Sequence, residues 1–206
     1  MPTDTPWFLA IGASGQDGLN DIRAVLTGLP PTLPVIVLVV LHRPWDMVSR
    51  LRHILAETSS MPVVEAEPGQ KFAVGTVYIG LPEQHLTLVE HSFGILVGDP
   101  HRRHRNRTVD LLFDSVARFG GDRMIGVVLS GQLDDGSRGL AAINRAGGHV
   151  MVVQRCEDRE KGMPEHAAMF EGPIDCIGTT AQIVQAIVAA VNADRNSPVI
   201  TPDAVA

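Results

Sequence analysis

Cysteine is scarce in this chain, because Cys156 and Cys176 are the only two among 206 residues. So few cysteines exclude a disulfide framework, and we expect reduced thiols in a cytoplasmic protein. Long apolar runs are also missing: the longest, Val35–Leu41, is far shorter than the roughly 18–20 residues that span a bilayer. Met1–Gly12 has no basic segment and only a brief apolar one, so we expect neither a signal peptide nor insertion into a membrane.

Basic residues are fewer than acidic residues. Lys and Arg number 17 against 23 acidic residues, a formal net charge of −6, which argues against nucleic acid as a partner. The 45% hydrophobic content excludes intrinsic disorder, and 206 residues suit one domain with a sizeable core. We expect this domain to cover residues 1–193. Residues 194–206, which carry Pro198 and Pro202 among small residues, are expected to form a disordered tail.

What is present first is an alternation of strand and helix patterns. Trp7–Ile11 and Val35–Leu41 are short apolar runs typical of buried strands. Leu19–Leu29 has the apolar spacing of an amphipathic helix, and Asp46–Glu57 also has a helical pattern. The first third is therefore βαβα, which predicts a parallel sheet with right-handed crossovers.

The remainder of the chain extends this pattern with one interruption. The interruption consists of short strands that suggest an antiparallel meander or hairpin: Val63–Glu65, Thr76–Ile79, Leu86–Val89 and Gly94–Val97. The alternation then resumes over Val109–Phe119 (helix), Met124–Leu129 (strand), Gly139–Arg145 (helix), Val150–Gln154 (strand), Ile174–Ile177 (strand) and Ala181–Val191 (helix). The predicted fold class is α/β: a doubly wound, mainly parallel sheet with helices on both faces and an antiparallel hairpin insertion.

Polar residues come at or shortly after the ends of three of the predicted buried strands. Ser14 comes after the first strand, His42 ends the second, and Asp134 and Asp135 follow Met124–Leu129. Ligands of open parallel sheets bind beyond the carboxyl ends of the strands, so these side chains are expected at one edge. A serine, a histidine and a carboxylate are the groups that acyl transfer needs, because an imidazole must activate the hydroxyl and a carboxylate must orient the imidazole.

Each of these residues also has a purely structural interpretation. Ser14 could cap the following helix, and His42 could be a hydrogen-bonded histidine at a strand end. Asp134 and Asp135 could form an Asx-turn or cap a helix before Gly136. Their joint position at the ends of three strands favours the catalytic interpretation, without deciding it.

A nucleotide-binding interpretation is the main rival. Gly12–Gly18 resembles a glycine-rich dinucleotide turn, and the helix N-terminus behind it could hold a pyrophosphate. The second strand ends in His42 and Arg43 rather than in an acidic residue, although Arg43 could take a 2′-phosphate. Tyr78, the only tyrosine, lacks a lysine four residues on, which disfavours a short-chain dehydrogenase.

The residues also resemble those of a known family, the CheB-type chemotaxis protein-glutamate methylesterases, over about Phe8 to Val191. The resemblance rests on these segments in order: Ile11–Gly15, Val39–Pro44, Val77–Gly80 with His85, Arg103–Arg105, Thr108–Phe113, Gly126–Gly131 with Asp135–Gly136, and Gly162–Pro164. It implies that Ser14 is the nucleophile, His42 the base and Asp135 the residue that orients His42. It also implies hydrolysis of glutamate methyl esters, with release of methanol, and deamidation of certain glutamines, on the cytoplasmic domain of methyl-accepting chemotaxis receptors. No metal or cofactor is implied, and we expect a monomer.

The chain departs from the family pattern near the expected oxyanion hole. Gly15 begins an altered turn after Ser14, and Gln132 stands beside Gly131 where methionine is common. We expect backbone amides at Gly15, Gly131 and Gln132 to lie near the oxyanion. Family members usually also carry an N-terminal receiver domain, and we expect this protein to lack one.

A basic segment, His101–Arg107, contains four arginines and no acidic residue. It is either a solvated loop or a surface near the site, with Arg105 close to the substrate, that attracts acidic receptor helices. If the altered turn has abolished catalysis, the alternative function is a receptor-binding module of the same fold.

Overall fold

The computed structural model describes residues 6–42, 50–80, 84–89, 93–98, 108–131, 134–154, 162–169 and 172–195. Its strands are β1 (Trp7–Ser14), β2 (Val35–His42), β3 (Val63–Glu65), β4 (Thr76–Ile79), β5 (Gln84–Val89), β6 (Phe93–Gly98), β7 (Met124–Val128), β8 (His149–Val153) and β9 (Cys176–Gly178). Its helices are α1 (Gly15–Gly28), α2 (Leu51–Ala56), α3 (Thr108–Phe119), α4 (Ser137–Arg145), α5 (Met163–Ala168) and α6 (Thr180–Arg195).

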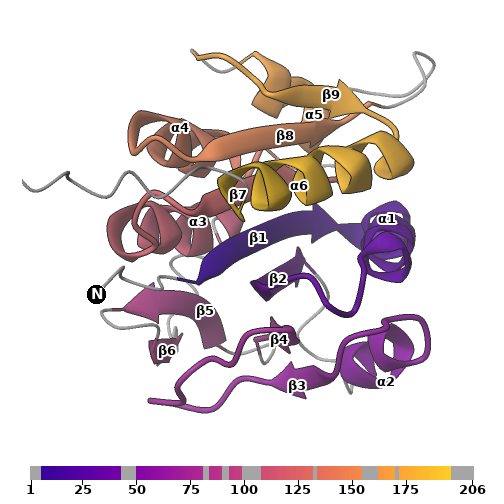
Figure 1. The fold of residues 1–206 in the computed structure, drawn as a ribbon, viewed down its shortest axis with the longest axis vertical. Coiled ribbons are helices and arrows are strands. Elements are labelled where there is room, and N and C mark those ends of the chain that lie inside the picture. The colour runs from indigo at the N-terminus through magenta and orange to yellow at the C-terminus, as the bar shows by residue number, and fades with distance from the viewer. Residues whose placement is uncertain are drawn as a thin grey trace, which may run out of the picture.

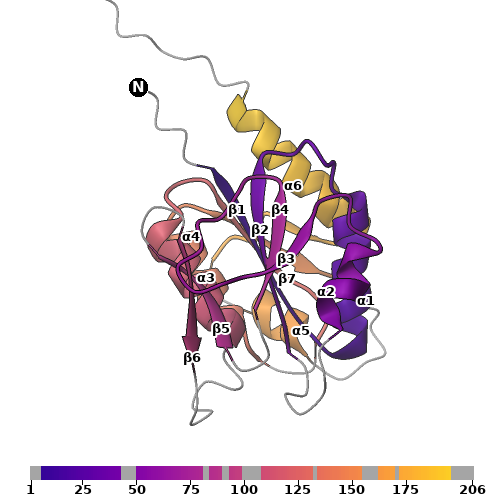
Figure 2. The ribbon, with the colours of Figure 1, turned by 90° about the horizontal axis from the view of Figure 1, so that it is seen from below.

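A seven-stranded sheet of order β3-β4-β2-β1-β7-β8-β9 forms the centre of the fold. All its strand pairs are parallel. Figure 1 shows the sheet fanning across the molecule, and Figure 2 shows α1, α2 and α6 on one face with α3 and α4 on the other. The predicted fold class is confirmed.

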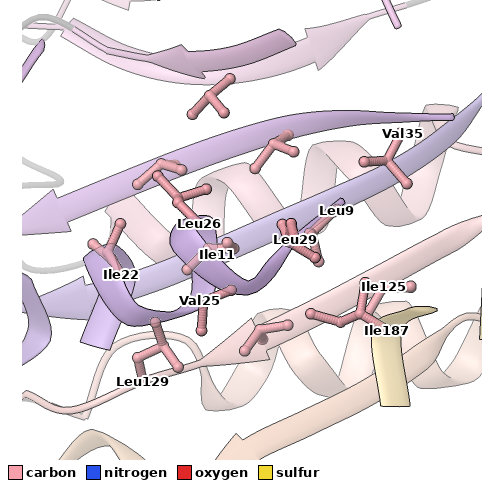
Figure 3. Close-up of a cluster of buried hydrophobic side chains, with 14 of the residues drawn as sticks. Leu9, Ile11, Ile22, Val25, Leu26, Leu29, Val35, Ile125, Leu129 and Ile187 are labelled. Carbon is pink, nitrogen blue, oxygen red and sulfur yellow. The ribbon is translucent and has the colours of Figure 1, made fainter. Parts of the chain in front are cut away.

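Alternate residues of β1 face two separate cores. Leu9 and Ile11 pack against Ile22 and Val25 of α1, in a cluster that also includes Ile187 of α6 (Figure 3). The even-numbered residues of β1 point the opposite way, toward the core that contains α3, α4 and α5. Because both faces are covered, β1 and β2 need apolar residues at nearly every position, as their sequences have.

The prediction for the middle of the chain is partly wrong. β3 and β4 belong to the main sheet and run parallel to each other and to β2. The crossover through α2 returns the chain to the same end of the sheet before β3 begins, which makes the pairing parallel. Only β5 and β6 pair antiparallel, as a separate two-stranded sheet. This hairpin is attached to α3, where Ser115 Oγ accepts a hydrogen bond of 2.9 Å from the backbone N–H of Leu88.

Several element boundaries also differ from the predictions. β1 continues to Ser14, and α1 begins at Gly15, earlier than the predicted start at Leu19. The prediction began too late because the first turn of α1 is polar and shows no apolar periodicity. The six-residue helix α5 was not predicted. α6 ends at Arg195, and the expected tail, apart from its first residues, lies outside the described residues. Among the described helices, none combines the length and the apolar content that crossing a bilayer requires.

Candidate active site

Ser14 is the last residue of β1 and directly precedes α1. Its backbone is extended, with φ −143° and ψ 143°, and its side chain makes no capping hydrogen bond to the helix. Gly15 has a φ of 69°, in the left-handed region that favours glycine, and so turns the chain sharply from strand into helix. The capping interpretation of Ser14 is therefore wrong, because the hydroxyl does not bond the helix that it precedes.

His42 ends β2 as the direct neighbour of Ser14. The parallel register pairs Ser14 with His42, and paired residues of adjacent strands project to the same face of a sheet. In both strands the even-numbered residues face the α3 side, as Ala10 and Leu38 do in the core there. The sheet register thus presents a hydroxyl and an imidazole side by side on one face.

Asp135 lies in the turn before α4 and binds His42. Its Oδ2 is 2.6 Å from Nε2 of His42, and the side chains are 0% and 11% exposed, respectively. The same carboxylate accepts backbone N–H bonds of 2.8 Å each from Val109 and Asp110 in the first turn of α3. Asp134 is exposed, and its backbone carbonyl accepts the Ser137 hydroxyl. The structure therefore brings Asp135, and not Asp134, to the imidazole.

The first turn of α3 adds two polar groups that sequence reasoning did not assign. Thr108 Oγ1 lies 3.1 Å from Nε2 of His42. Asp110 Oδ1 accepts N–H bonds from Gly136 at 3.0 Å and Gly139 at 2.8 Å, at the start of α4. Burial raises the pKa of the Asp110 carboxyl, opposed by the bond from Gly139 and reinforced by the negative charge of Asp135. The sequence predicts a helix over Val109–Phe119 and includes Thr108–Phe113 in the family resemblance, but it assigns no role to Thr108 or Asp110.

Glycine allows the surrounding elements to approach Ser14 closely. A Cβ on Gly12 would lie 2.2 Å from Cγ1 of Val109, so the start of α3 rests directly on β1. A Cβ on Gly131 would lie 2.8 Å from Cβ of Ser14 and 2.4 Å from Sδ of Met163. Gly131 therefore lies beside Ser14, and the buried Met163 packs against the same face of Gly131.

Two predicted site residues, Gln132 and Arg105, lie outside the described residues, as does the basic segment 101–107. In the described part of the chain, no three His, Cys, Asp or Glu side chains are grouped so that they could hold a metal ion. The described site thus contains Ser14, Gly15, His42, Gly131 and Asp135, arranged at the carboxyl edge of the sheet on its α3 side. A hydroxyl beside an imidazole that binds a buried carboxylate is suited to nucleophilic acyl transfer.

Comparison with known proteins points to one family. Residues 9–187 match the family model described as CheB methylesterase. A protein-glutamate methylesterase/protein-glutamine glutaminase of Yersinia pestis is 34% identical over 192 residues, which cover 91% of this chain and 54% of that protein. The protein of the same name from Salmonella typhimurium is 31% identical over 192 residues, with the same coverage. The chain thus spans about half the length of these curated relatives.

A solved structure agrees with these matches. The crystal structure of the Thermotoga maritima CheB methylesterase catalytic domain superimposes with a TM-score of 0.78 at 26% sequence identity. The superposition covers 89% of this chain and 97% of that domain. The fold therefore has a counterpart in a solved structure over 89% of the chain.

Proposed function

The chain belongs to the CheB methylesterase family, and from this premise we propose that it is a serine esterase that hydrolyses glutamate γ-methyl esters. The substrate is the cytoplasmic domain of a chemoreceptor, and the enzyme acts in the cytoplasm. The observation that carries the proposal is the 2.6 Å contact between His42 and the buried Asp135, with Ser14 as the register neighbour of His42.

Catalysis begins with activation of Ser14. An ionised carboxylate only accepts hydrogen bonds, so Nε2 of His42 donates its proton to Asp135 and Nδ1 carries the lone pair. Nδ1 takes the hydroxyl proton as Ser14 Oγ attacks the ester carbonyl carbon. Asp135 stabilises the resulting imidazolium and keeps the ring in this tautomer. This assignment leaves Nδ1 to Ser14, while Nε2 lies beside both Asp135 Oδ2 and Thr108 Oγ1.

The tetrahedral intermediate then collapses to an acyl-enzyme. His42 returns the proton to the leaving methoxide, which departs as methanol. A water molecule, deprotonated by His42, attacks the acyl-enzyme and releases the glutamate carboxylate and free Ser14. We assign the stabilisation of the negative charge that develops on the carbonyl oxygen to the first N–H groups of α1, which begins at Gly15, and to the backbone at Gly131 beside Ser14.

Deamidation of glutamine follows the same course. The carboxamide has the same acyl group as the methyl ester, and ammonia leaves in place of methanol. The names of the relatives combine these two activities. One constellation of Ser14, His42 and Asp135 is therefore sufficient for both reactions.

The test is methanol release from methylated receptor cytoplasmic fragments by the wild type and by Ser14→Ala. We expect the substitution to lower the rate by at least about 10⁴-fold, because it removes the nucleophile. The free energy of unfolding should change by less than about 0.5 kcal/mol, since the hydroxyl makes no capping bond.

Ser137→Ala is the matched control. It removes a serine hydroxyl at the start of α4, on the same edge of the sheet, that donates a hydrogen bond to the backbone carbonyl of Asp134. Its rate should equal that of the wild type. Methanol release by Ser14→Ala at the wild-type rate would contradict the role of Ser14. A folded wild type that binds the fragments without turnover would instead identify a receptor-binding module.

A further inference from the structure

Asp110 forms a reciprocal pair of helix caps with Asp135. Asp135, just before α4, caps the first turn of α3 by accepting the N–H groups of Val109 and Asp110. Asp110, in that first turn, caps α4 by accepting the N–H groups of Gly136 and Gly139. The Asp135 carboxylate therefore satisfies backbone donors at the start of α3, and the Asp110 carboxylate satisfies those at the start of α4.

These reciprocal hydrogen bonds fix the backbone conformation of the turn that contains Asp135. Gly136 follows Asp135 directly and has a φ of 103°, so the turn there is sharp and left-handed. The bond from the Gly136 N–H to Asp110 holds that turn against α3. In return, the Asp110 N–H donates to Oδ1 of Asp135 and leaves Oδ2 to Val109 and His42.

The close packing of α3 and α4 leaves the pair little freedom to move. A Cβ on Gly139 would lie 2.5 Å from Cβ of Phe113 and 3.2 Å from Cα of Asp110. The two helices therefore meet backbone to backbone at the level of the caps. Only a short acceptor at position 110 can reach both N–H groups of α4 in this space.

We propose that Asp110 is a positioning residue for the reaction, which orients Asp135 and, through Asp135, the imidazole of His42. The proposal rests on the proposed esterase function. Burial of Asp110 beside a second carboxylate opposes its ionisation and so lowers the stability of the folded protein. A residue that only caps a helix does not need this negative charge. Serine, threonine and asparagine also cap helices without bringing a second negative charge to the site.

The test is Asp110→Asn, which keeps an acceptor oxygen and the shape but removes the charge and one carboxylate oxygen. We expect kcat for methanol release to fall between about tenfold and about 100-fold, because small displacements of catalytic groups have effects of this size. KM should stay within about twofold, because the Asp110 carboxylate binds the backbone at the start of α4 and is proposed to act on the reaction only through Asp135.

A spectroscopic measurement makes the test independent of turnover. The N–H proton of His42 that is bound to Asp135 should give a far-downfield proton NMR resonance, identified by its absence in His42→Ala. In Asp110→Asn this resonance should move upfield or broaden, because the bond between His42 and Asp135 lengthens. A wild type without esterase activity would contradict the proposed function, while this resonance would still report on the positioning by Asp110.

Asp175→Asn is the matched control. Asp175 also binds an imidazole and a backbone N–H, with Oδ1 2.9 Å from Nδ1 of His149 and Oδ2 2.8 Å from the N of Val150. This pair lies at the start of β8 and β9, at the opposite edge of the sheet. Asp175→Asn should leave kcat and the His42 resonance unchanged.

The proposal is overturned if Asp110→Asn matches Asp175→Asn in both kcat and the resonance. If Asp110→Asn does not fold, Asp110→Glu replaces it, because glutamate keeps the charge but shifts the acceptor by one methylene. A folded Asp110→Glu protein with lowered kcat and a shifted resonance supports the proposal, and wild-type values of both overturn it.

Discussion

At the scale of single residues, the carboxylate of Asp135 has two tasks that depend on each other. It accepts two backbone N–H bonds at the start of α3 and a third bond from His42, with no exposure of the side chain to solvent. Buried carboxylates are tolerated when their acceptor capacity is filled in this way. The residue proposed to orient the catalytic base is thus itself oriented by the backbone of a helix.

The raised pKa of Asp110 predicts that its contribution to the free energy of unfolding depends on pH. The pKa of its carboxyl is raised in the folded protein, so the native state holds this proton at pH values where the unfolded chain has lost it. The contribution of Asp110 to stability is therefore fully present below its unfolded pKa and is lost as pH rises through the raised value. Asn at this position does not titrate.

We therefore expect the free energy of unfolding of Asp110→Asn, relative to wild type, to rise between pH 3 and pH 7. Urea denaturation of both proteins at several pH values measures this difference, and the titration of groups distant from Asp110 cancels. A difference that stays flat, or that falls with pH, would contradict the raised pKa of Asp110.

At the scale of elements, the contact of α3 with β1 determines where the caps lie. Gly12 has no side chain, and Val109 occupies the space that a Cβ would need. Gly12→Ala should push the first turn of α3 away from the sheet and cost about 1–3 kcal/mol in the free energy of unfolding. It should also lower kcat, because Val109 and Asp110 supply the N–H groups that hold Asp135.

The double variant Gly12→Ala, Val109→Ala tests whether this contact is the cause. Removal of the Val109 methyl groups frees the space, so the double variant should be more stable than the sum of the two single changes implies. Chemical denaturation of all four proteins gives the coupling. Additive effects would show that Gly12→Ala lowers stability for a reason other than its contact with Val109 of α3.

Helices and strands that show a clear apolar pattern along the chain were predictable from the sequence. β1 and β2 were found because they are continuous apolar runs, and α3 because its apolar residues recur at helical spacing. The direction of β3 and β4 was not predictable, because three- and four-residue strands look alike in parallel and antiparallel pairing. α5 is a single short segment whose position depends on its contact with Gly131.

At the scale of the whole molecule, the sheet order explains why part of the site was predictable. β1 has β2 on one side and β7 on the other, so the residues that follow these three strands converge at one edge. Ser14, His42 and Asp135 follow this rule and could be proposed from the sequence. Thr108 and Asp110 do not follow a strand, and their roles come from the seating of α3 on Gly12, which only the three-dimensional structure reveals.

The two cores on opposite faces of the sheet allow stability and catalysis to be separated. Ile187 of α6 is 0% exposed and packs in the core on the α1 face, whereas Ser14 and His42 face α3. Ile187→Ala should lower the free energy of unfolding by about 2–5 kcal/mol through loss of buried methyl groups and the cavity left behind. Its kcat, measured well below its melting temperature, should remain that of the wild type, because the sheet lies between the cavity and the site.

Ile177→Ala is the control for this change, because the same substitution on β9 affects a side chain that is 53% exposed. It should alter the free energy of unfolding by no more than about 0.5 kcal/mol. Urea denaturation and methanol release, measured on both variants, check the two expectations together. If Ile187→Ala lowered kcat in proportion to stability, the two faces of the sheet would be coupled, and the site would depend on the packing of α6 as well as on that of α3.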